Sequence, residues 1–266
     1  MKCKDMIAVL EELAPRRCAC NWDNPGLLAG RTEKEVKKVL LTVDVDDRTV
    51  ETAIREGADM IVSHHPLIFK AVKHVTDEDF IGRRLVQMIQ ADISYFAMHT
   101  NFDAAPGCMA DVVAEHLGIV FGAPLEELGE ENGVPFGIGK IGVLQAPMNG
   151  RAFAKKVKEE FGLPFVTVYG SELWETEPVK VAATCPGSGS STIREALEKG
   201  AQVLVTGDIG HHDGIDAEAQ GLMIIDAGHY GLEHVFMEYM ENYIKEQVGE
   251  EIEVIRMPLT FPAVVI

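Results

Sequence analysis

Two adjacent histidines follow a short apolar run in the segment VSHHPLIF, residues 62–69. The apolar run predicts a buried strand, and ligands of open α/β sheets collect where such strands end. Pro66 favours an extended backbone at His65, and successive side chains of an extended chain point apart. His64 and His65 are therefore better placed to bind two different metal ions than to share one. The alternative is a surface loop with two polar residues.

A second segment with metal-binding side chains is HTNFDAAPG, residues 99–107, which also follows an apolar run. Asp103 offers a hard oxygen ligand. His99 is either a ligand or a residue that hydrogen-bonds a ligand. Asp is also common at helix and turn caps, so a structural role of Asp103 is the alternative.

A third segment is DAGHYGLEHVF, residues 226–236, in which His229 and Glu233 are four positions apart. They share one face if a helix begins by Tyr230, although a surface His–Glu pair has the same spacing. Glu233 has two oxygens and can bridge two cations. Strand ends that supply both imidazoles and carboxylates suit zinc, manganese, iron or nickel better than calcium.

Two further segments have polar residues where a strand meets a helix. In TGDIGHHDGID, residues 206–216, His212 is a candidate acid or base for substrate chemistry; a capped turn is the alternative. The segment CPGSGSSTIREAL, residues 185–197, opens a helix with a glycine-rich loop but lacks the GxxxxGK pattern of a P-loop. It favours a tight connection over a phosphate site.

Apolar runs alternate with helical patterns along the whole chain, which indicates α/β layers with largely parallel strands. The predicted strands are residues 36–43, 59–62, 93–98, 140–144, 164–168, 179–183, 203–205 and 223–226. The predicted helices are residues 48–56, 79–90, 110–117, 151–161, 191–199 and a long one from about residue 232.

The two halves of the sequence resemble each other. TVETAIREGADMIVSHH matches TIREALEKGAQVLVTGD at an offset of 143 residues, and at an offset of 130 His99 aligns with His229 and Asp103 with Glu233. We therefore predict two related α/β lobes, residues 1–124 and 136–266, with a site in the cleft between them. The segment 122–137, rich in Gly, Pro and acidic residues, is expected to link the lobes, and the C-terminal helix to pack back on the first.

The composition indicates a soluble globular protein. The chain has 266 residues, 47% of them hydrophobic, and 42 acidic against 24 basic residues give a net charge of −18. Such acidity disfavours nucleic-acid binding, and the apolar runs are too short to span a membrane. The five cysteines are odd in number and contain no CxxC pair. We expect reduced thiols and a cytoplasmic location.

The segments NWDNPGLLAG, SHHPLIF, HTNFDAAPG, TGDIGHHDGID and DAGHYGLE occur in the order seen in one known family. Together they resemble the NGG-interacting-factor-like proteins, often labelled GTP cyclohydrolase type 2 homologues or dinuclear metal-centre proteins. The resemblance covers about residues 1–261. It departs where relatives commonly have APGGVND and this chain has APGCMAD, residues 105–111. This departure bears on whether this chain shares the substrate of the family, and less on whether it shares the metal ligands.

The resemblance implies two divalent metal ions per chain. His65 and Asp103 then look like ligands of one ion, His64 and His229 like ligands of the other, and Glu233 like a bridge between them. The resemblance also implies a homohexameric ring.

Two metal ions held by these residues would suit a metal-dependent hydrolase that acts on a phosphoester-like substrate, and the label of the resembling family implies a nucleotide as the other substrate class. His99 and His212 are the candidate catalytic residues, which would orient the substrate or pass a proton. The alternative is a non-enzymatic metal-binding protein with a regulatory or scaffold role. A coordination position that holds water would favour the enzyme, and saturation by protein ligands would favour the scaffold.

Overall fold

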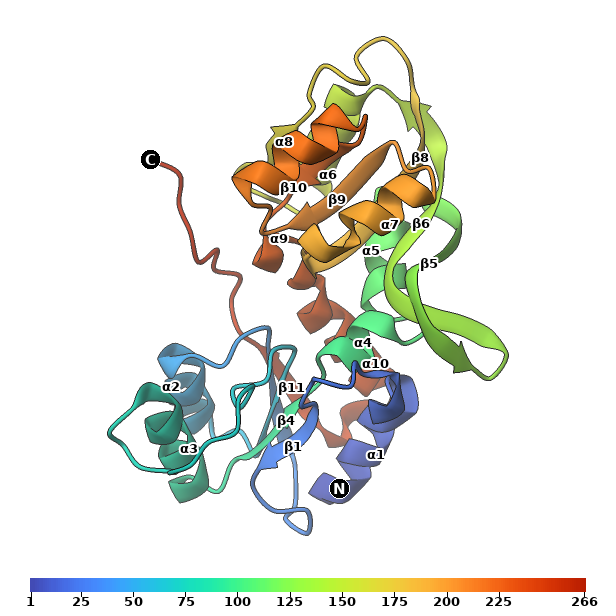
Figure 1. Cartoon of the computed structure of the whole chain (residues 1–266). Helices are drawn as coiled ribbons and strands as arrows, with labels where there is room; N and C mark the ends of the chain where they lie inside the picture. The colour runs from blue at the N-terminus through green and yellow to red at the C-terminus, as the bar shows by residue number, and fades with distance from the viewer. The chain divides into compact units, whose positions relative to one another are not determined.

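The computed structural model describes all 266 residues, and these form two compact units. The first unit comprises residues 1–102 and 236–260, and the second comprises residues 103–235 and 261–266. The first unit therefore ends earlier in the chain than the expected boundary at residue 124, and it gains the C-terminal helix and the last strand. Each unit is built around its own β-sheet (Figure 1).

The sheet of the first unit has five strands in the order β1-β4-β3-β2-β11. They are β1 (Gly26–Ala29), β2 (Lys38–Thr42), β3 (Met60–Ser63), β4 (Ser94–Ala97) and β11 (Glu253–Arg256). All neighbours are parallel except β1, which runs antiparallel to β4. The central strands β3 and β4 are buried at every residue, as expected for parallel strands covered on both faces.

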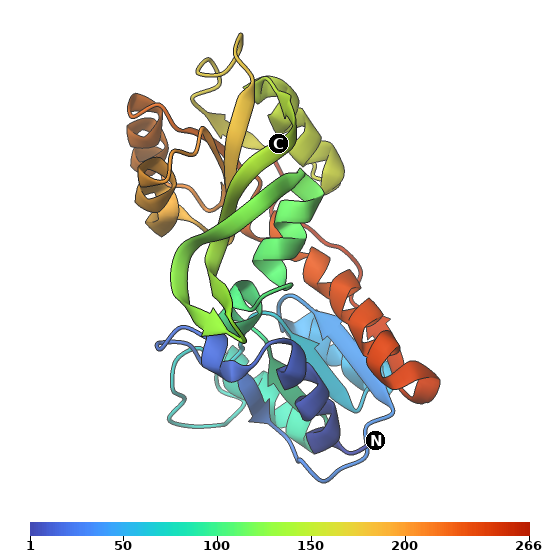
Figure 2. The same cartoon turned by 90° about the vertical axis from the view of Figure 1, so that its right-hand side faces the viewer.

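Helices cover both faces of this sheet. They are α1 (Cys3–Leu13), α2 (Asp47–Glu56), α3 (Phe80–Gln90) and α10 (Val235–Val248), and the short helix α4 (Thr100–Ala104) follows β4. Figure 1 shows α2 and α3 on one side of the strands and α1 and α10 on the other, and Figure 2 shows α1 and α10 from a second direction. Leu40, Ile61 and Tyr95 lie side by side on neighbouring strands and belong to the core under α2 and α3.

The connection into β3 shows why the histidine segment starts where it does. Asp46 caps α2, because its carboxylate accepts a hydrogen bond of 2.8 Å from the backbone N–H of Thr49. Gly57 ends the helix in the left-handed conformation, with φ at 64°. The chain then enters β3 at Met60 and leaves it at Ser63, so His64 and His65 are the first residues after the strand.

The sheet of the second unit has six strands in the order β5-β6-β8-β9-β10-β7. They are β5 (Ile119–Glu131), β6 (Val134–Met148), β7 (Thr167–Tyr169), β8 (Val179–Ser188), β9 (Val203–Gly207) and β10 (Met223–Asp226). The central strands β8, β9 and β10 are parallel, and the outer ones are antiparallel to their neighbours. Helices α7 and α8 cover one face, and α5 and α6 cover the other (Figure 1). These helices are α5 (Met109–Leu117), α6 (Gly150–Glu160), α7 (Ile193–Glu198) and α8 (His211–Ala219).

The internal similarity of the sequence corresponds to a repeated arrangement of elements. Strands β2, β3 and β4 with helices α2 and α3 form a parallel β-α-β-α-β unit, and β8, β9 and β10 with α7 and α8 form another. Gly57 and Gly200 both follow the first helix of their repeat with positive φ, at 64° and 77°. Most of the length difference between the halves lies in the long loop after β3. The predicted architecture of two related α/β lobes is confirmed.

Residues 122–137, expected to link the lobes, instead lie in the β5–β6 hairpin of the second unit. Asn132 and Gly133 form its turn with φ values of 52° and 81°. An Asn-Gly pair with both residues at positive φ is typical of a two-residue hairpin turn. The sequence therefore contained the signal for this hairpin, but the many glycines and acidic residues obscured the strands on either side.

The remaining elements are short. Three 3₁₀ turns cover Arg16–Cys18, Ser190–Thr192 and Gly249–Glu251, and helix α9 covers His229–Glu233. None of the helices has both the length and the apolar character that crossing a membrane requires.

Candidate metal centre

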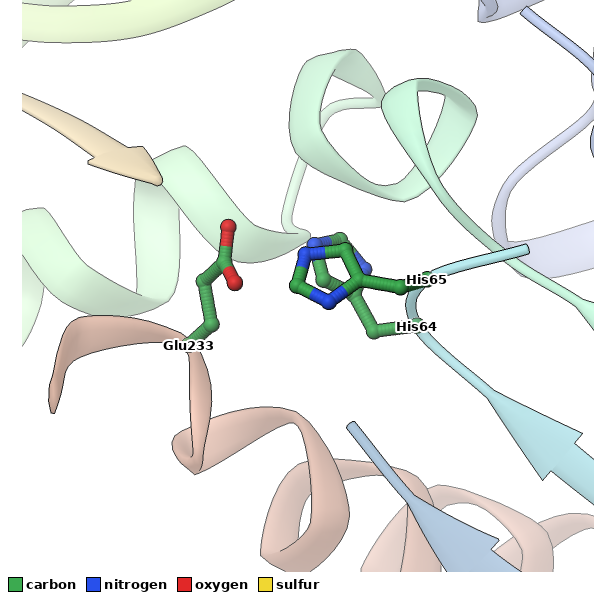
Figure 3. Close-up of side chains that lie close together, drawn as sticks. All are labelled: His64, His65 and Glu233. Carbon is green, nitrogen blue, oxygen red and sulfur yellow. The ribbon is translucent and has the colours of Figure 1, made fainter. Parts of the chain in front are cut away.

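The segment after β3 continues the pairing of that strand with β2. The backbone N–H groups of His64 and His65 donate hydrogen bonds of 3.2 Å and 2.9 Å to the carbonyls of Thr42 and Val43. The chain then bends at both residues, and the two rings lie close together with their centroids 4.9 Å apart. The prediction that the two side chains point apart is therefore wrong. Figure 3 shows both imidazoles beyond the end of β3, and it shows Glu233 on helix α9 of the second unit.

The hydroxyl of Tyr95 restrains the backbone of the histidine segment. It donates a hydrogen bond of 3.0 Å to the carbonyl of His65 and accepts one of 2.7 Å from the N–H of Leu67. The Ser63 hydroxyl also donates to the carbonyl of His65, at 2.7 Å. Tyr95 is fully buried, and this burial raises the pKa of its hydroxyl to about 12, so the group keeps its proton. This role could not be predicted from the sequence, because Tyr95 lies in another strand, β4.

Each histidine of the pair has an acceptor at Nδ1. In His64, which is fully buried, Nδ1 lies 2.8 Å from the carbonyl oxygen of Met98. In His65, Nδ1 lies 2.8 Å from a carboxylate oxygen of Asp44. A proton on Nδ1 that is donated in this way leaves the lone pair on Nε2, which is the state of a metal-binding imidazole.

His99 is held in the same manner by Asp23. Its Nδ1 lies 2.7 Å from Oδ1 of Asp23. The other carboxylate oxygen, Oδ2, accepts hydrogen bonds from the backbone N–H and the hydroxyl of Thr100. The ring of His99 lies with its centroid 5.5 Å from each of the rings of His64 and His65. The structure thus brings the predicted catalytic histidine against the predicted ligand pair within the first unit.

The charged carboxylate of Asp23 is buried. Its side chain has no exposed surface. Burial alone would raise the pKa of this carboxyl, but hydrogen bonds from His99 and Thr100 outweigh burial and lower it to about 2. Asp23 belongs to the segment NWDNPG, which the sequence marked only through its resemblance to a family. Its partners lie more than 70 positions away, so spacing could not reveal the role.

In the second unit, helix α9 brings His229 and Glu233 together. Nδ1 of His229 lies 2.7 Å from a carboxylate oxygen of Asp208, and its Nε2 lies 3.3 Å from Oε2 of Glu233. The Glu233 side chain is only 3% exposed. Gly187 in β8 makes room for this pair, since a Cβ there would lie 2.6 Å from Oε1 of Glu233. The predicted shared face of His229 and Glu233 is confirmed.

Asp103 and Glu233 both influence the buried thiol of Cys185. Burial is the largest cause that raises the pKa of this thiol to about 12, and the charges of Asp103 and Glu233 raise it further. The two predicted carboxylate ligands therefore lie near one common side chain of the second unit.

His212 is less closely connected to these residues. It lies exposed in the first turn of α8, with its ring centroid 5.2 Å from that of His211. Its catalytic role stays a prediction. The glycine-rich segment forms the end of β8 and a tight turn into α7, where a side chain at Gly189 would collide with Thr206. The structural interpretation of that loop is therefore confirmed.

The donor chemistry of these residues fits a metal of the zinc, manganese, iron or nickel type. Imidazoles and carboxylates form the set, and His64, His65 and His229 each have an acceptor that fixes the ring through Nδ1. Such acceptors are the usual partners of metal-binding histidines.

Comparison with known families agrees with this picture. The profile described as Duf34/NIF3 (NGG1p interacting factor 3) matches residues 1–260. The chain belongs to the Duf34/NIF3 family.

Named relatives and solved structures match almost the whole chain. A protein of Streptococcus pneumoniae, named GTP cyclohydrolase 1 type 2 homolog, is 32% identical over 259 residues, covering 96% of each chain. A protein of the same name from Clostridium perfringens is 30% identical over 255 residues, covering 96% of this chain and 95% of the relative. The crystal structure of a Bacillus cereus protein related to NIF3 superposes with a TM-score of 0.88 at 24% identity, covering 100% of this chain and 99% of that one. This last similarity concerns the fold.

Replacement of Tyr95 by Phe should loosen the histidine segment. It removes one hydroxyl and leaves the Leu67 N–H and the His65 carbonyl without that partner, which costs about 1–3 kcal/mol. Chemical denaturation monitored by circular dichroism should show a lower free energy of unfolding. Tyr169→Phe, which deletes the hydroxyl of a half-buried tyrosine of the second unit, is the control. Equal stability of the two variants would contradict the role given to Tyr95.

Acid should weaken the first unit through Asp23. The pKa of this carboxyl is about 2 in the folded protein and 3.8 in its usual state. Its stabilisation is therefore complete above pH 3.8 and lost as the pH falls through about 2, and it amounts to about 2 kcal/mol. Asp23→Asn should flatten the pH dependence of unfolding in this window, whereas Asp77→Asn, at an exposed position, should not. An unchanged pH profile in Asp23→Asn would refute the assignment.

Proposed function

We propose that the chain is a dinuclear metal-dependent hydrolase that acts on a nucleotide or phosphoester-like substrate. One observation carries the proposal. His64, His65 and Glu233 form a group in which one ligand atom from each lies within 4.8 Å of the others (Figure 3). Two imidazoles and a buried carboxylate are a ligand set that suits a divalent transition metal.

The full ligand set that we propose has five residues. His65 and Asp103 bind one ion, His64 and His229 bind the other, and Glu233 bridges both. The separate acceptors that orient the two rings through Nδ1, the Met98 carbonyl for His64 and the Asp44 carboxylate for His65, support the division of the histidine pair between two ions. The common influence of Asp103 and Glu233 on Cys185 supports a pair of carboxylates in the same part of the second unit.

Two bound divalent ions supply a water of lowered pKa and hold an oxygen-rich group. The protein residues around the ions orient the ligand side chains and restrain their motion. Asp44, Asp208 and the Met98 carbonyl fix the ring planes of the proposed ligands. Asp23 holds Nδ1 of His99, so that Nε2 of His99 is the atom that orients the substrate or passes a proton. The positions of the ligand histidines are thus set before any substrate arrives.

The names of the relatives support a nucleotide as one substrate class. Several curated relatives are named GTP cyclohydrolase 1 type 2 homolog. From this name we infer only the class of substrate for the present chain. Cys108 and Ala110, where relatives commonly have Gly and Asn, argue against the transfer of one particular nucleotide. The homohexamer and the cytoplasmic location stay predictions.

Glu233→Gln should release both ions, because a neutral amide bridges two cations poorly. Protein loaded with manganese or zinc and then dialysed should retain about two equivalents per chain in the wild type. The variant should retain less than one when measured by plasma mass spectrometry. Glu218→Gln, at an exposed position of α8, should behave like the wild type. Full retention by Glu233→Gln would contradict the proposed bridge.

Turnover should separate the residues that bind metal from those that act on substrate. Hydrolysis, measured over a panel of nucleotides and phosphoesters, should stop on chelation and return with manganese or zinc. His65→Ala should lower both metal content and turnover, because it removes a ligand. His212→Ala should lower turnover at least about tenfold and leave metal content unchanged.

The same assay distinguishes the rival interpretations. Equal loss of metal from His212→Ala and His65→Ala would make His212 a ligand. A fully metallated protein that hydrolyses no member of the panel would favour the non-enzymatic regulatory or scaffold role.

A further inference from the structure

Two large aromatic side chains of the first unit are exposed next to each other. Trp22 is 62% exposed and Phe69 is 50% exposed. Their ring centroids are 5.9 Å apart with an angle of 65° between the ring planes, which is an edge-to-face contact. Aromatic side chains usually contribute to stability by burial. Neighbouring aromatic rings that remain accessible are therefore candidates for a binding surface.

This aromatic pair adjoins the histidines of the same unit. The ring of His99 lies 6.1 Å from that of Trp22 and 6.2 Å from that of Phe69, measured between centroids. His99 in turn contacts the rings of His64 and His65, each at 5.5 Å. The exposed rings are therefore separated from the proposed metal ligands by one imidazole.

The two loops that carry the aromatic rings are tied together. The side-chain amide of Asn24 donates a hydrogen bond of 2.7 Å to the carbonyl of Ile68, the residue before Phe69. The backbone N–H of Asp23 donates one of 3.0 Å to the carbonyl of Cys20 and closes a tight turn around Trp22. The loops that carry the rings are thus held together before anything binds, which lowers the entropic cost of ordering them on binding.

The size and position of the pair indicate what it binds. A stable protein interface covers about 800 Å² on each partner, which is more than two aromatic side chains provide. One planar heteroaromatic ring matches this area, and stacking of a nucleic-acid base on an aromatic side chain is worth about 1–3 kcal/mol. A nucleotide joins such a ring to a phosphate, the kind of group that divalent ions hold.

We propose that Trp22 and Phe69 form a stacking platform for the base of a nucleotide whose phosphate reaches the histidine pair. This inference rests on the proposed function and adds to it the residues that select for a planar base. The platform gives the segment NWDNPG two tasks. Trp22 contacts the ligand, and Asp23 beside it holds His99.

Binding of four probes tests the platform: GMP, AMP, UMP and ribose 5-phosphate, which has the phosphate and sugar but no base. The chain has two tryptophans, so a Trp174→Phe background makes Trp22 the only source of tryptophan fluorescence. At least one nucleotide should quench this fluorescence, and ribose 5-phosphate should not. By calorimetry on metal-loaded protein, Trp22→Ala should weaken the binding of that nucleotide about tenfold or more. It should weaken the binding of ribose 5-phosphate less than twofold.

Two further variants protect the test against simple misfolding. Phe69→Leu keeps an apolar side chain but removes the ring, and it should weaken the nucleotide several-fold. Phe80→Ala removes another exposed ring of the same unit, on α3, and should bind all four probes like the wild type. Metal content should be unchanged in all three variants.

Several results would overturn the platform. They are equal nucleotide affinity in Trp22→Ala and wild type, an absence of quenching by every nucleotide, and a parallel loss of ribose 5-phosphate binding. A change of oligomeric state in Trp22→Ala, measured by light scattering, would show instead that the rings contact a second copy of the chain. A wild-type protein that retains no metal would contradict the proposed function alone, because quenching by the base can be measured on metal-free protein.

Discussion

The orientation of imidazole rings is the constraint on which the candidate site depends. A histidine binds a metal only through a nitrogen without a proton, and the ring must point in one direction. At the candidate site four histidines meet that condition through an acceptor at Nδ1: His64, His65, His99 and His229. One acceptor is a backbone carbonyl and the other three are carboxylates. Each acceptor lies in a different segment of the chain from the histidine that it orients.

These acceptors explain much of the surrounding structure. Asp44 follows β2, Asp23 precedes β1 and Asp208 follows β9, so strand ends place the carboxylates as well as the imidazoles. The Tyr95 hydroxyl adds a restraint on the backbone rather than on a ring. A site built this way needs the sheet to form first, because the acceptors come from segments far apart in the chain.

The sequence predicted those parts of the site that are local in the chain. The pair His64–His65, the spacing of His229 and Glu233, and the strand–helix alternation are all visible within short windows. Asp23 and Tyr95 were not visible, because each acts on residues 28 to 77 positions away. Such contacts are set by strand order, which periodicity does not reveal. The β5–β6 hairpin was missed for a different reason, since charge and glycine content outweighed its Asn-Gly turn.

The division of the chain has a consequence for how it folds during synthesis. Residues 103–235 of the second unit interrupt the first unit, whose strand β11 pairs in parallel with β2 only after residue 253 has been made. The second unit, apart from its last six residues, is therefore complete while the first still lacks an edge strand and helix α10. Domains fold as units as they emerge from the ribosome. In this chain the N-terminal sheet therefore keeps an apolar face and a strand edge uncovered until the C-terminal helix and strand have been synthesised.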